Sequence, residues 1–592
     1  MKPRLVLFRS RYDPDLPDFL VAHSYEHIRC LQQSFDVTVV SGNCDYDAVC
    51  DIHKPDVSAF EIGLQLPDSR TSISNTHTHP RVPKIGLMNA DAWGGTRSVI
   101  LSDVENLQLN AVFSICTTTG EHLPAMSGQL FYWPNFVDTS VFRDYGLEKL
   151  VPIAITGASN KNYPWRQAIY PRIGSVYPTI VCPHRGYSKS SPRMQMLHGV
   201  AYAKVLASAW FSPTCGTAAR ELVRKHLEIP ACKTALITEE CSSIALAGFV
   251  DMENCVLADE HNVLDKISYL FDNPERLQQL IDAGHQLVVS RHTMRNRTQV
   301  ADWFSLSRTL GPTQRLVQAN PFESLSVAEC SSAQSTLHLS SSGAHLGMIR
   351  TGDSLLRSKK IDEARAAYDG SLRVFDTLAE PQLRLVACDL LQGKPEEALR
   401  RVLSLLKYTL GRYEDVDPDP AEWAYLIVCL LCLGRVKAAS RRVRQYAYLS
   451  HPDLDRVRTV VRLINPHQLG STSLDSTRGS RGSLHTTLHA DNEAWLSHLS
   501  DMLAACGRPT LSAATSATAV SIFQADVART RSRVDVNSNR RESVRRPLGF
   551  WRPYLPGSGL LRGFDNPLLW SALVERFTIR LSWLRESRQR AD

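Results

Sequence analysis

Five short apolar segments between Val151 and Leu257 are each followed by a polar or Gly/Pro turn and then by a helical pattern. They are VPIAITG (from Val151), TIVCPH (from Thr179), AWFSPTCG (from Ala209), TALITEE (from Thr234) and NCVLADE (from Asn254). Strands that are apolar throughout and alternate with helices are typical of a parallel sheet buried on both faces. In such sheets functional groups gather where the strands end. These ends carry Gly157, His184, Arg185, Thr214, Cys215, Gly216 and Glu239.

A similar pattern precedes this one. Apolar strands are expected at residues 4–8, 36–40, 57–62, 84–88, 111–115 and 130–133, with an amphipathic helix at 21–33. The two patterns together predict an α/β fold with two Rossmann-like lobes that face a cleft. The N-terminal lobe covers residues 1–135 and the C-terminal lobe residues 136–308. A charged helical pattern from Asp272 to Phe304 is expected to close the second lobe.

The rest of the chain differs in composition. Residues 309–343 are rich in Ser, Gln, Thr and Pro and predict a linker. In residues 344–465, KKIDEA and GKPEEA place their closing alanines, Ala364 and Ala398, 34 residues apart, and a looser third copy ends at Ala439. This period predicts an all-α domain of tetratricopeptide-like repeats, a protein-docking architecture. An irregular helical bundle is the alternative.

Residues 466–546 are rich in Ser and Arg, and we expect them to be mostly disordered apart from a helix near Asn492–Cys506. The Arg-rich stretch Arg529–Arg546 suits nucleic acid, a membrane surface or an acidic partner, with solubilising disorder as the simpler interpretation. In residues 547–592, the pattern Asn566–Leu584 predicts an amphipathic helix. It would pack against the repeats or lie on a membrane.

Composition sets broad limits. With 592 residues the chain is too long for one hydrophobic core, and a net charge of +7 is too small for that length to indicate nucleic-acid binding by itself. The first residues lack the apolar core of a signal peptide, and no run of about eighteen apolar residues occurs. The 14 cysteines lack the dense spacing of a secreted disulfide framework. We therefore expect a cytoplasmic protein.

The motifs of the second lobe occur in a recognisable order: ITGASNKNYPWR, CPHRGY, GVAYAKVLASAWFSPTCGT, RKHLEIPACKTALITE and AGFVDMENCVLADE, preceded by WPNFVD at Trp133–Asp138. In order and spacing they resemble the CgeB-like (spore maturation type) group of GT-B glycosyltransferases, which is related to glycosyltransferase group 1. The resemblance covers residues 130–305, and residues 1–130 more loosely. It implies a GT-B pair of lobes, with a nucleotide-sugar donor on the second and an unknown acceptor on the first. It implies no cofactor and no bound metal.

A nucleotide-sugar diphosphate requires fixed positive charge and free backbone N–H groups. Gly157 and Gly216 allow the backbone to approach it, and a helix N-terminus after Gly216 would add a favourable dipole. Arg166, Arg185 and Lys204 are the candidate cations, since cationic side chains pair with phosphate oxygens. His184 adjoins Arg185 at a strand end. A solvated surface charge is the alternative for each basic residue.

The resemblance also implies a ribose contact for Glu228, whose carboxylate can hold two neighbouring hydroxyl groups. The alternative is a surface ion pair with Arg224 one helical turn earlier. Two positions differ from group 1. Lys233 replaces a glycine, and an earlier glutamate of that family falls on Arg220, one position before Glu221.

Other motifs are weaker. His77, His79, Asp91 and Asn135 near strand ends of the first lobe are possible base or acceptor contacts, or structural residues. The H-x-x-E-H match at His23–His27 lies in the first helix of a β-α-β unit, where zinc chemistry is not expected. Cys429 and Cys432 form a CxxC within an apolar helix and are interpreted as buried thiols. We expect a glycosyltransferase with a protein-docking repeat domain, or alternatively a non-catalytic scaffold built on a decayed glycosyltransferase fold.

Overall fold

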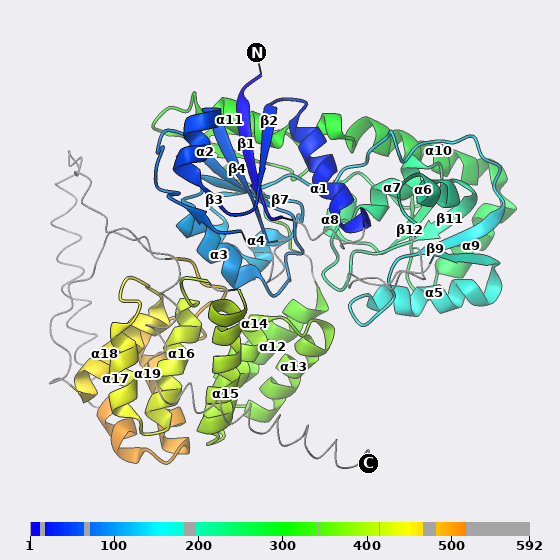
Figure 1. Ribbon diagram of the computed structural model, residues 1–592. Helices are drawn as coiled ribbons and strands as arrows, with labels where there is room; N and C mark the ends of the chain where they lie inside the picture. Colours follow the sequence, from blue (N-terminus) through cyan, green and yellow to red (C-terminus); the bar gives the residue numbers. More distant parts are fainter. Residues whose placement is uncertain are drawn as a thin grey trace, which may run out of the picture. The chain divides into compact units, whose positions relative to one another are not determined.

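The computed structural model describes residues 2–11, 18–63, 71–182, 197–340, 343–413, 415–465 and 481–516 (Figure 1). Predictions for His184, Arg185, the Arg-rich stretch Arg529–Arg546 and the helix at Asn566–Leu584 lie outside these residues.

The first lobe contains a six-stranded parallel sheet with the order β2-β1-β4-β6-β7-β8. Its strands are β1 (Arg4–Arg9), β2 (Asp36–Ser41), β4 (Val57–Ile62), β6 (Lys84–Met88), β7 (Ala111–Ser114) and β8 (Leu130–Tyr132). The helices of this lobe are α1 (Asp18–Leu31), α2 (Tyr46–His53), α3 (Arg97–Asn106) and α4 (Thr119–His122), with a small pair of strands, β3 (Cys44–Asp45) and β5 (Ile73–Ser74). The six main strands match the apolar segments within about two residues.

The second lobe contains a five-stranded parallel sheet with the order β10-β9-β11-β12-β13. Its strands are β9 (Val151–Thr156), β10 (Thr179–Cys182), β11 (Ala209–Pro213), β12 (Ala235–Thr238) and β13 (Val256–Leu257). The helices are α5 (Pro164–Val176), α6 (Gly199–Ala207), α7 (Lys225–Ala231), α8 (Ser242–Leu246), α9 (Val263–Asp272) and α10 (Pro274–Arg291). The predicted fold class, a pair of Rossmann-like lobes, is confirmed.

The two lobes are joined by two chain segments that cross side by side. In the first, Val137 donates its backbone N–H to the carbonyl of His292 in the second (2.9 Å). The buried guanidinium of Arg297 donates to the carbonyls of Pro134 and Asn135 (2.9 and 2.8 Å). The segment Trp133–Asp138 is therefore held in place by backbone and side-chain hydrogen bonds.

The helical pattern predicted from Asp272 to Phe304 is not one element that closes the second lobe. Helix α10 ends at Arg291, a 3₁₀ turn covers Met294–Asn296, and α11 covers Gln299–Ser307. Trp303 and Phe304 of α11 belong to the apolar core of the first lobe. Helix α11 therefore returns to the first lobe, because its apolar face fits the core of that lobe.

The segment interpreted as a linker, residues 309–343, has structure of its own. It forms the antiparallel hairpin β14 (Gln314–Val317) and β15 (Ser326–Glu329). The buried side chain of Gln318 accepts a hydrogen bond from the backbone N–H of Tyr132 (2.7 Å) and donates to its carbonyl (3.0 Å). This amide therefore satisfies the open edge of β8, which the polar composition gave no reason to expect.

The C-terminal part of the described chain is helical, coloured light green to orange in Figure 1. Its helices are α12 (Ala344–Arg357), α13 (Ile361–Val374), α14 (Ala379–Leu391), α15 (Pro395–Leu406), α16 (Pro420–Cys432), α17 (Val436–Arg444), α18 (Pro452–Ile464) and α19 (Asn492–Ala505), with a π-helical turn at Lys407–Arg412. Consecutive helices from α12 to α16 pack on one another. Ala364 and Ala398, the repeat positions, are both fully buried. The all-α domain is confirmed, and its tetratricopeptide-like character stays a prediction.

This helical domain shares an apolar core with the first lobe. Phe60 and Ile100 of that lobe belong to the same buried cluster as Leu383 and Leu426 of the helices. Cys429 and Cys432 lie in α16 as buried free thiols. In the part of the chain that the structure describes, no helix is both long and apolar enough to cross a membrane.

Candidate functional site

The strand order of the second lobe reverses between β9 and β11, so the loops after these two strands diverge at the carboxyl edge of the sheet. Ligands of open α/β sheets bind in the crevice at such a switch point. Arg166, in the first turn of α5, is almost completely buried there. Its Nη1 donates to the carbonyl of Ala158 after β9 (2.8 Å), and its Nη2 donates to Thr214 Oγ1 and the carbonyl of Cys215 after β11 (3.0 and 2.8 Å). Arg166 therefore ties the two loops together.

Gly157, directly after β9, brings the backbone against two cations. Its φ is +90°, and a Cβ at this position would lie 2.7 Å from Arg166 Nη1 and still closer to Lys225 Nζ. Only glycine combines this backbone conformation with so close an approach. The sequence predicted that the backbone at Gly157 approaches a diphosphate; the structure shows this backbone against the two basic side chains, and the diphosphate contact stays a prediction.

Lys225 begins α7 and was not predicted from the sequence. Burial and then the positive charge of Arg166 lower the pKa of its ammonium group to about 7, and the charge of Glu228 opposes both effects. Among the described residues, no carboxylate lies within salt-bridge distance of its Nζ. Arg166 is hydrogen-bonded to neutral groups, so within the described part of the chain neither basic side chain forms an ion pair with a carboxylate. An anionic ligand would stabilise the charged form of Lys225.

Glu228 lies on α7, three residues after Lys225, and is buried rather than on the surface. It pairs with Arg224 (Nε to Oε1, 3.4 Å), as the alternative interpretation proposed. Arg224 also forms an ion pair with Glu26 of α1 in the first lobe. Burial raises the pKa of Glu228, while Arg224 and Lys225 lower it. Its ribose contact stays a prediction.

Glu26 is the glutamate of the H-x-x-E-H match, and in the structure it forms an ion pair with Arg224 of the second lobe. The neighbouring His27 ring lies against the ring of Trp133, with centroids 4.9 Å apart. Burial is the main cause that lowers the pKa of His27 well below its usual value. These contacts make the motif part of the contact region between the lobes.

Gly216 lies against the backbone of Glu221, and no helix begins directly after it. A Cβ at Gly216 would overlap the backbone of Glu221, so the chain turns tightly here. The next helix begins only at Lys225, so the expected dipole contribution at Gly216 is wrong. The Gly216 N–H donates weakly to Glu239 (3.4 Å), whose pKa is raised to about 7 by burial.

Glu221 connects the two lobes. Its buried carboxylate accepts hydrogen bonds from Thr117 Oγ1 (2.7 Å), Thr118 N (2.9 Å) and Thr118 Oγ1 (2.8 Å), all in the loop after β7 of the first lobe. These bonds occupy the carboxylate with protein donors. The glutamate near the position expected from group 1 therefore has a structural use in this chain.

Several predicted residues lie apart from the two cations. Lys204 is exposed in the last turn of α6, with its Nζ 5.9 Å from the Tyr145 ring centroid. Lys233 forms an ion pair with Asp282. Asn135 donates to the carbonyl of Leu222 (3.4 Å). None of these contacts involves Arg166 or Lys225.

The remaining candidates of the first lobe have different surroundings. His77 is exposed, and His79 lies 3.0 Å from Asp47 and 3.9 Å from Asp51. The ligand atoms of these last three residues lie within 4.8 Å of one another, a spacing that could hold a metal ion. Asp91 is exposed by its accessible surface. Desolvation by the surrounding protein, and then the charge of Glu221, raise the pKa of its carboxyl group to about 6.

Fold and site together define a pair of Rossmann-like lobes with a centre of two basic side chains, Arg166 and Lys225, at the switch point of the second lobe. Residues 151–302, which contain this centre, match the family model described as glycosyl transferase-like. No curated protein matches the chain.

Solved structures also match the chain, at low sequence identity. Sucrose-phosphate synthase from Thermosynechococcus elongatus is 10% identical with a TM-score of 0.37, over 52% of this chain and 98% of that one. HepE from Anabaena, solved with UDP and glucose, is 10% identical with a TM-score of 0.34, over 52% and 100%. MnaA from S. aureus, solved with UDP, is 13% identical with a TM-score of 0.30, over 53% and 99%.

Proposed function

We propose that the protein is a glycosyltransferase that transfers a sugar from a nucleotide-diphosphate sugar to an acceptor. The observation that carries this proposal is the meeting of Arg166, Lys225 and the backbone of Gly157 at the switch point. This arrangement lies within the segment that matches the glycosyl transferase-like family model. Two basic side chains that pair with no carboxylate of the described residues, beside a loop that only glycine can form, suit a diphosphate.

The chemistry follows from the charges. When the bond between the sugar and the diphosphate breaks, negative charge accumulates on the leaving diphosphate and positive charge on the sugar ring. Arg166, which its hydrogen bonds hold in place before the substrate binds, and Lys225 stabilise the leaving group. Glu228, close enough to influence the pKa of Lys225, accepts hydrogen bonds from the ribose hydroxyl groups. With phosphate charge neutralised by side chains, this proposal requires no metal ion and no cofactor.

The test is nucleotide binding to the purified full chain. UDP or GDP at about 100 times its dissociation constant should stabilise the protein by about 2.7 kcal/mol. Lys225→Ala should remove most of this effect, whereas Lys204→Ala, which deletes an exposed lysine of the same lobe, should leave it unchanged. No stabilisation by any nucleotide or nucleotide sugar in a broad panel would refute the proposal.

A second function, a non-catalytic scaffold, is favoured by Glu221. Its carboxylate is engaged by Thr117 and Thr118, and Lys233 stands where group 1 enzymes have glycine. A scaffold of this kind would bind nucleotide without transferring or hydrolysing the sugar. Detectable turnover of any nucleotide sugar would exclude it, and binding without turnover across an acceptor screen would favour it.

A further inference from the structure

Residues Arg481–Ala490, called the strap here, lie on the helical domain although they form no helix or strand. Their sequence is RGSLHTTLHA, a polar segment within a part of the chain expected to be disordered. Arg481, Leu484, His485 and Leu488 of the strap are nonetheless all buried. A segment without regular structure and with few apolar residues does not order itself. Its conformation is therefore imposed by the surface on which it lies.

The helical domain holds the strap largely by its backbone. Arg384 of α14 donates to the carbonyl of Thr486 (2.8 Å), and Arg357 of α12 donates to that of Leu488 (3.0 Å). Arg456 of α18 donates to the carbonyls of His489 and Ala490 (2.9 and 2.7 Å). Contacts to carbonyl groups do not depend on side-chain identity. These three arginines therefore form a surface that binds a chain segment without regular secondary structure.

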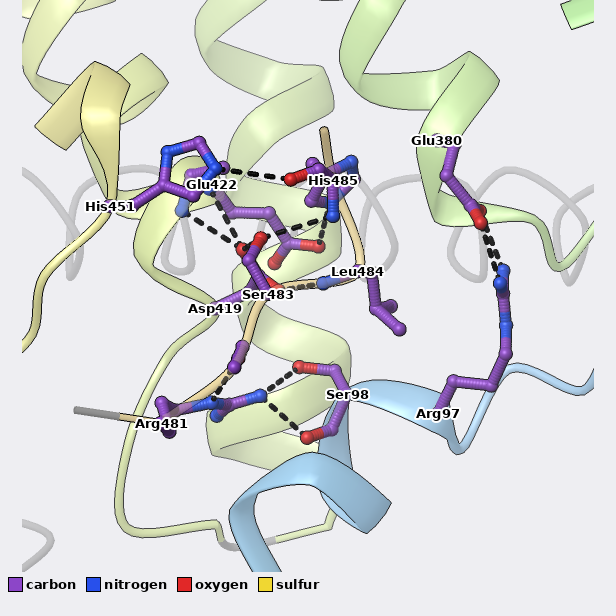
Figure 2. A network of polar contacts seen from close by, with 12 residues as sticks. Arg97, Ser98, Glu380, Asp419, Glu422, His451, Arg481, Ser483, Leu484 and His485 are labelled. Atoms are coloured by element: carbon purple, nitrogen blue, oxygen red, sulfur yellow. Dashed lines mark hydrogen bonds and ion pairs between the residues drawn. The ribbon is translucent and has the colours of Figure 1, made fainter. Parts of the chain in front are cut away.

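Acidic side chains of the same surface select particular residues of the strap (Figure 2). Asp419, at the N-terminus of α16, accepts hydrogen bonds from Ser483 Oγ (2.8 Å) and Leu484 N (2.9 Å). Glu422, one turn further along α16, lies 3.1 Å from the ring of His485. Asp453 of α18 accepts from Thr487 Oγ1 (2.7 Å). The surface is thus acidic where the strap offers donors.

Arg481 and two leucine side chains of the strap make further contacts. Arg481 donates to the backbone carbonyl and hydroxyl of Ser98 in α3 of the first lobe (2.5 and 2.8 Å; Figure 2). Leu484 and Leu488 belong to the large apolar core of the helical domain. The buried side chains of the strap are therefore an arginine, then a leucine and a histidine, then a second leucine, while the less buried hydroxyl groups of Ser483 and Thr487 add the contacts to Asp419 and Asp453.

We propose that this surface of the helical domain is a docking site for an irregular segment of a partner protein, and that the strap occupies it in cis. The partner segment would carry arginine, leucine, histidine and leucine at the spacing R-x-x-L-H-x-x-L. Binding of an extended segment through its backbone, with a few side chains giving specificity, is a recurring mode of peptide recognition. A tethered competitor has an effective concentration of about a millimolar, so the partner must displace the strap. This inference is independent of the proposed transferase activity.

The test uses a fluorescein-labelled peptide of sequence RGSLHTTLHA and the full chain. In a chain with Arg481→Ser and Leu484→Ser, the strap is weakened, and the peptide should bind at least about tenfold more tightly than to the unsubstituted chain. A peptide with aspartate at the first leucine should not bind. Adding Arg456→Ala to the weakened chain should reduce binding by about tenfold or more. A weakened chain that keeps its circular dichroism and melting temperature but does not bind the peptide overturns the proposal.

A second measurement needs no substitution. In the unsubstituted chain, excess peptide should accelerate hydrogen exchange of the Leu484 amide, which the strap now donates to Asp419. Unchanged exchange at saturating peptide overturns the proposal. Concentration-dependent dimerisation of the unsubstituted chain through its strap would replace the partner by a second copy, and would overturn the assignment of a separate partner.

Discussion

At the residue scale, the protonation of Lys225 predicts a pH dependence of ligand binding. Burial and Arg166 lower the pKa of its ammonium group to about 7, so the free chain loses this charge as the pH rises through 7. A bound diphosphate favours the charged form, and binding above pH 7 must therefore take up a proton. Affinity for UDP or GDP should fall by up to about tenfold per pH unit between pH 7 and 9. Calorimetry in buffers of different ionisation enthalpy would measure both effects.

The matched control for this prediction is Lys225→Arg. A guanidinium stays charged across the whole range, so the pH dependence should largely disappear even if the affinity changes. Affinity that is independent of pH in the unsubstituted chain would contradict the assignment of Lys225 to the phosphate site.

Substitution by alanine should have opposite effects on stability at Gly157 and at Gly174. Gly157→Ala places a methyl group against Lys225 and Arg166 at a φ of +90°, which should cost about 1–2 kcal/mol or more. Gly174, inside α5, has open space around its Cβ position and no unusual φ. Gly174→Ala should therefore stabilise the chain by about 0.5–1 kcal/mol. Urea unfolding followed by circular dichroism would compare the two, and equal effects would contradict the local geometry.

Sequence reasoning reached only part of the candidate site, and the residues show why. Gly157 and Arg166 follow a recognisable strand end, so their place at the switch point could be predicted. Lys225 could not be found from a strand end, because a long turn separates β11 from α7. A signal was nevertheless present, since Lys225 precedes Glu228 by one helical turn. Lys204 was predicted from its charge alone, and the charge of a residue does not show whether its side chain faces the site or the solvent.

At the scale of elements, apolar patterns predicted the positions of the strands well. They predicted poorly which part of the fold a segment packs against. The buried strands of both lobes carry their own signal, because each residue contacts a covered face of the sheet. Hairpin β14–β15, helix α11 and the strap depend instead on partners far away in sequence. Gln318 satisfies the edge of β8, and Trp303 completes the core of the first lobe. Such long-range contacts leave little trace in local composition.

The contact between α3 and α14 also predicts an acid-dependent stability. Arg97 and Glu380 form a bidentate ion pair (both 2.6 Å; Figure 2). Burial alone would raise the pKa of Glu380, but Arg97 outweighs it and lowers this pKa to about 2. The stabilisation is therefore complete above the usual value near 4.5 and is lost as the pH falls from there toward 2. Glu380→Gln should destabilise the chain by about 3 kcal/mol at neutral pH, since it leaves a buried Arg97 unpaired.

Urea unfolding at a series of pH values would test this ion pair. The difference in unfolding free energy between the unsubstituted chain and Glu380→Gln should be constant above about pH 5 and should narrow in more acidic solution. As a control, Asp376→Asn removes the partner of Lys161 in an exposed ion pair and should change stability by less than about 1 kcal/mol. A difference that does not depend on pH would show that the pair contributes through packing alone.

At the scale of the whole molecule, one small apolar cluster joins the two lobes and the helical domain. Trp93 of the first lobe, Ala219 of the second, and Phe375 of the helical domain all belong to it, with the Trp93 and Phe375 rings stacked at 5.7 Å. Phe375→Ala should cost about 3 kcal/mol through the cavity it leaves. Because the cavity borders all three parts, hydrogen exchange should accelerate together near Trp93, Ala219 and Leu378.

Leu280→Ala removes a leucine from a core cluster confined to the second lobe, and should accelerate exchange in that lobe only. Acceleration confined to the helical domain in Phe375→Ala would mean that the three parts are stabilised independently, and that the proposed binding of a nucleotide to one lobe has no route to the helices through this cluster.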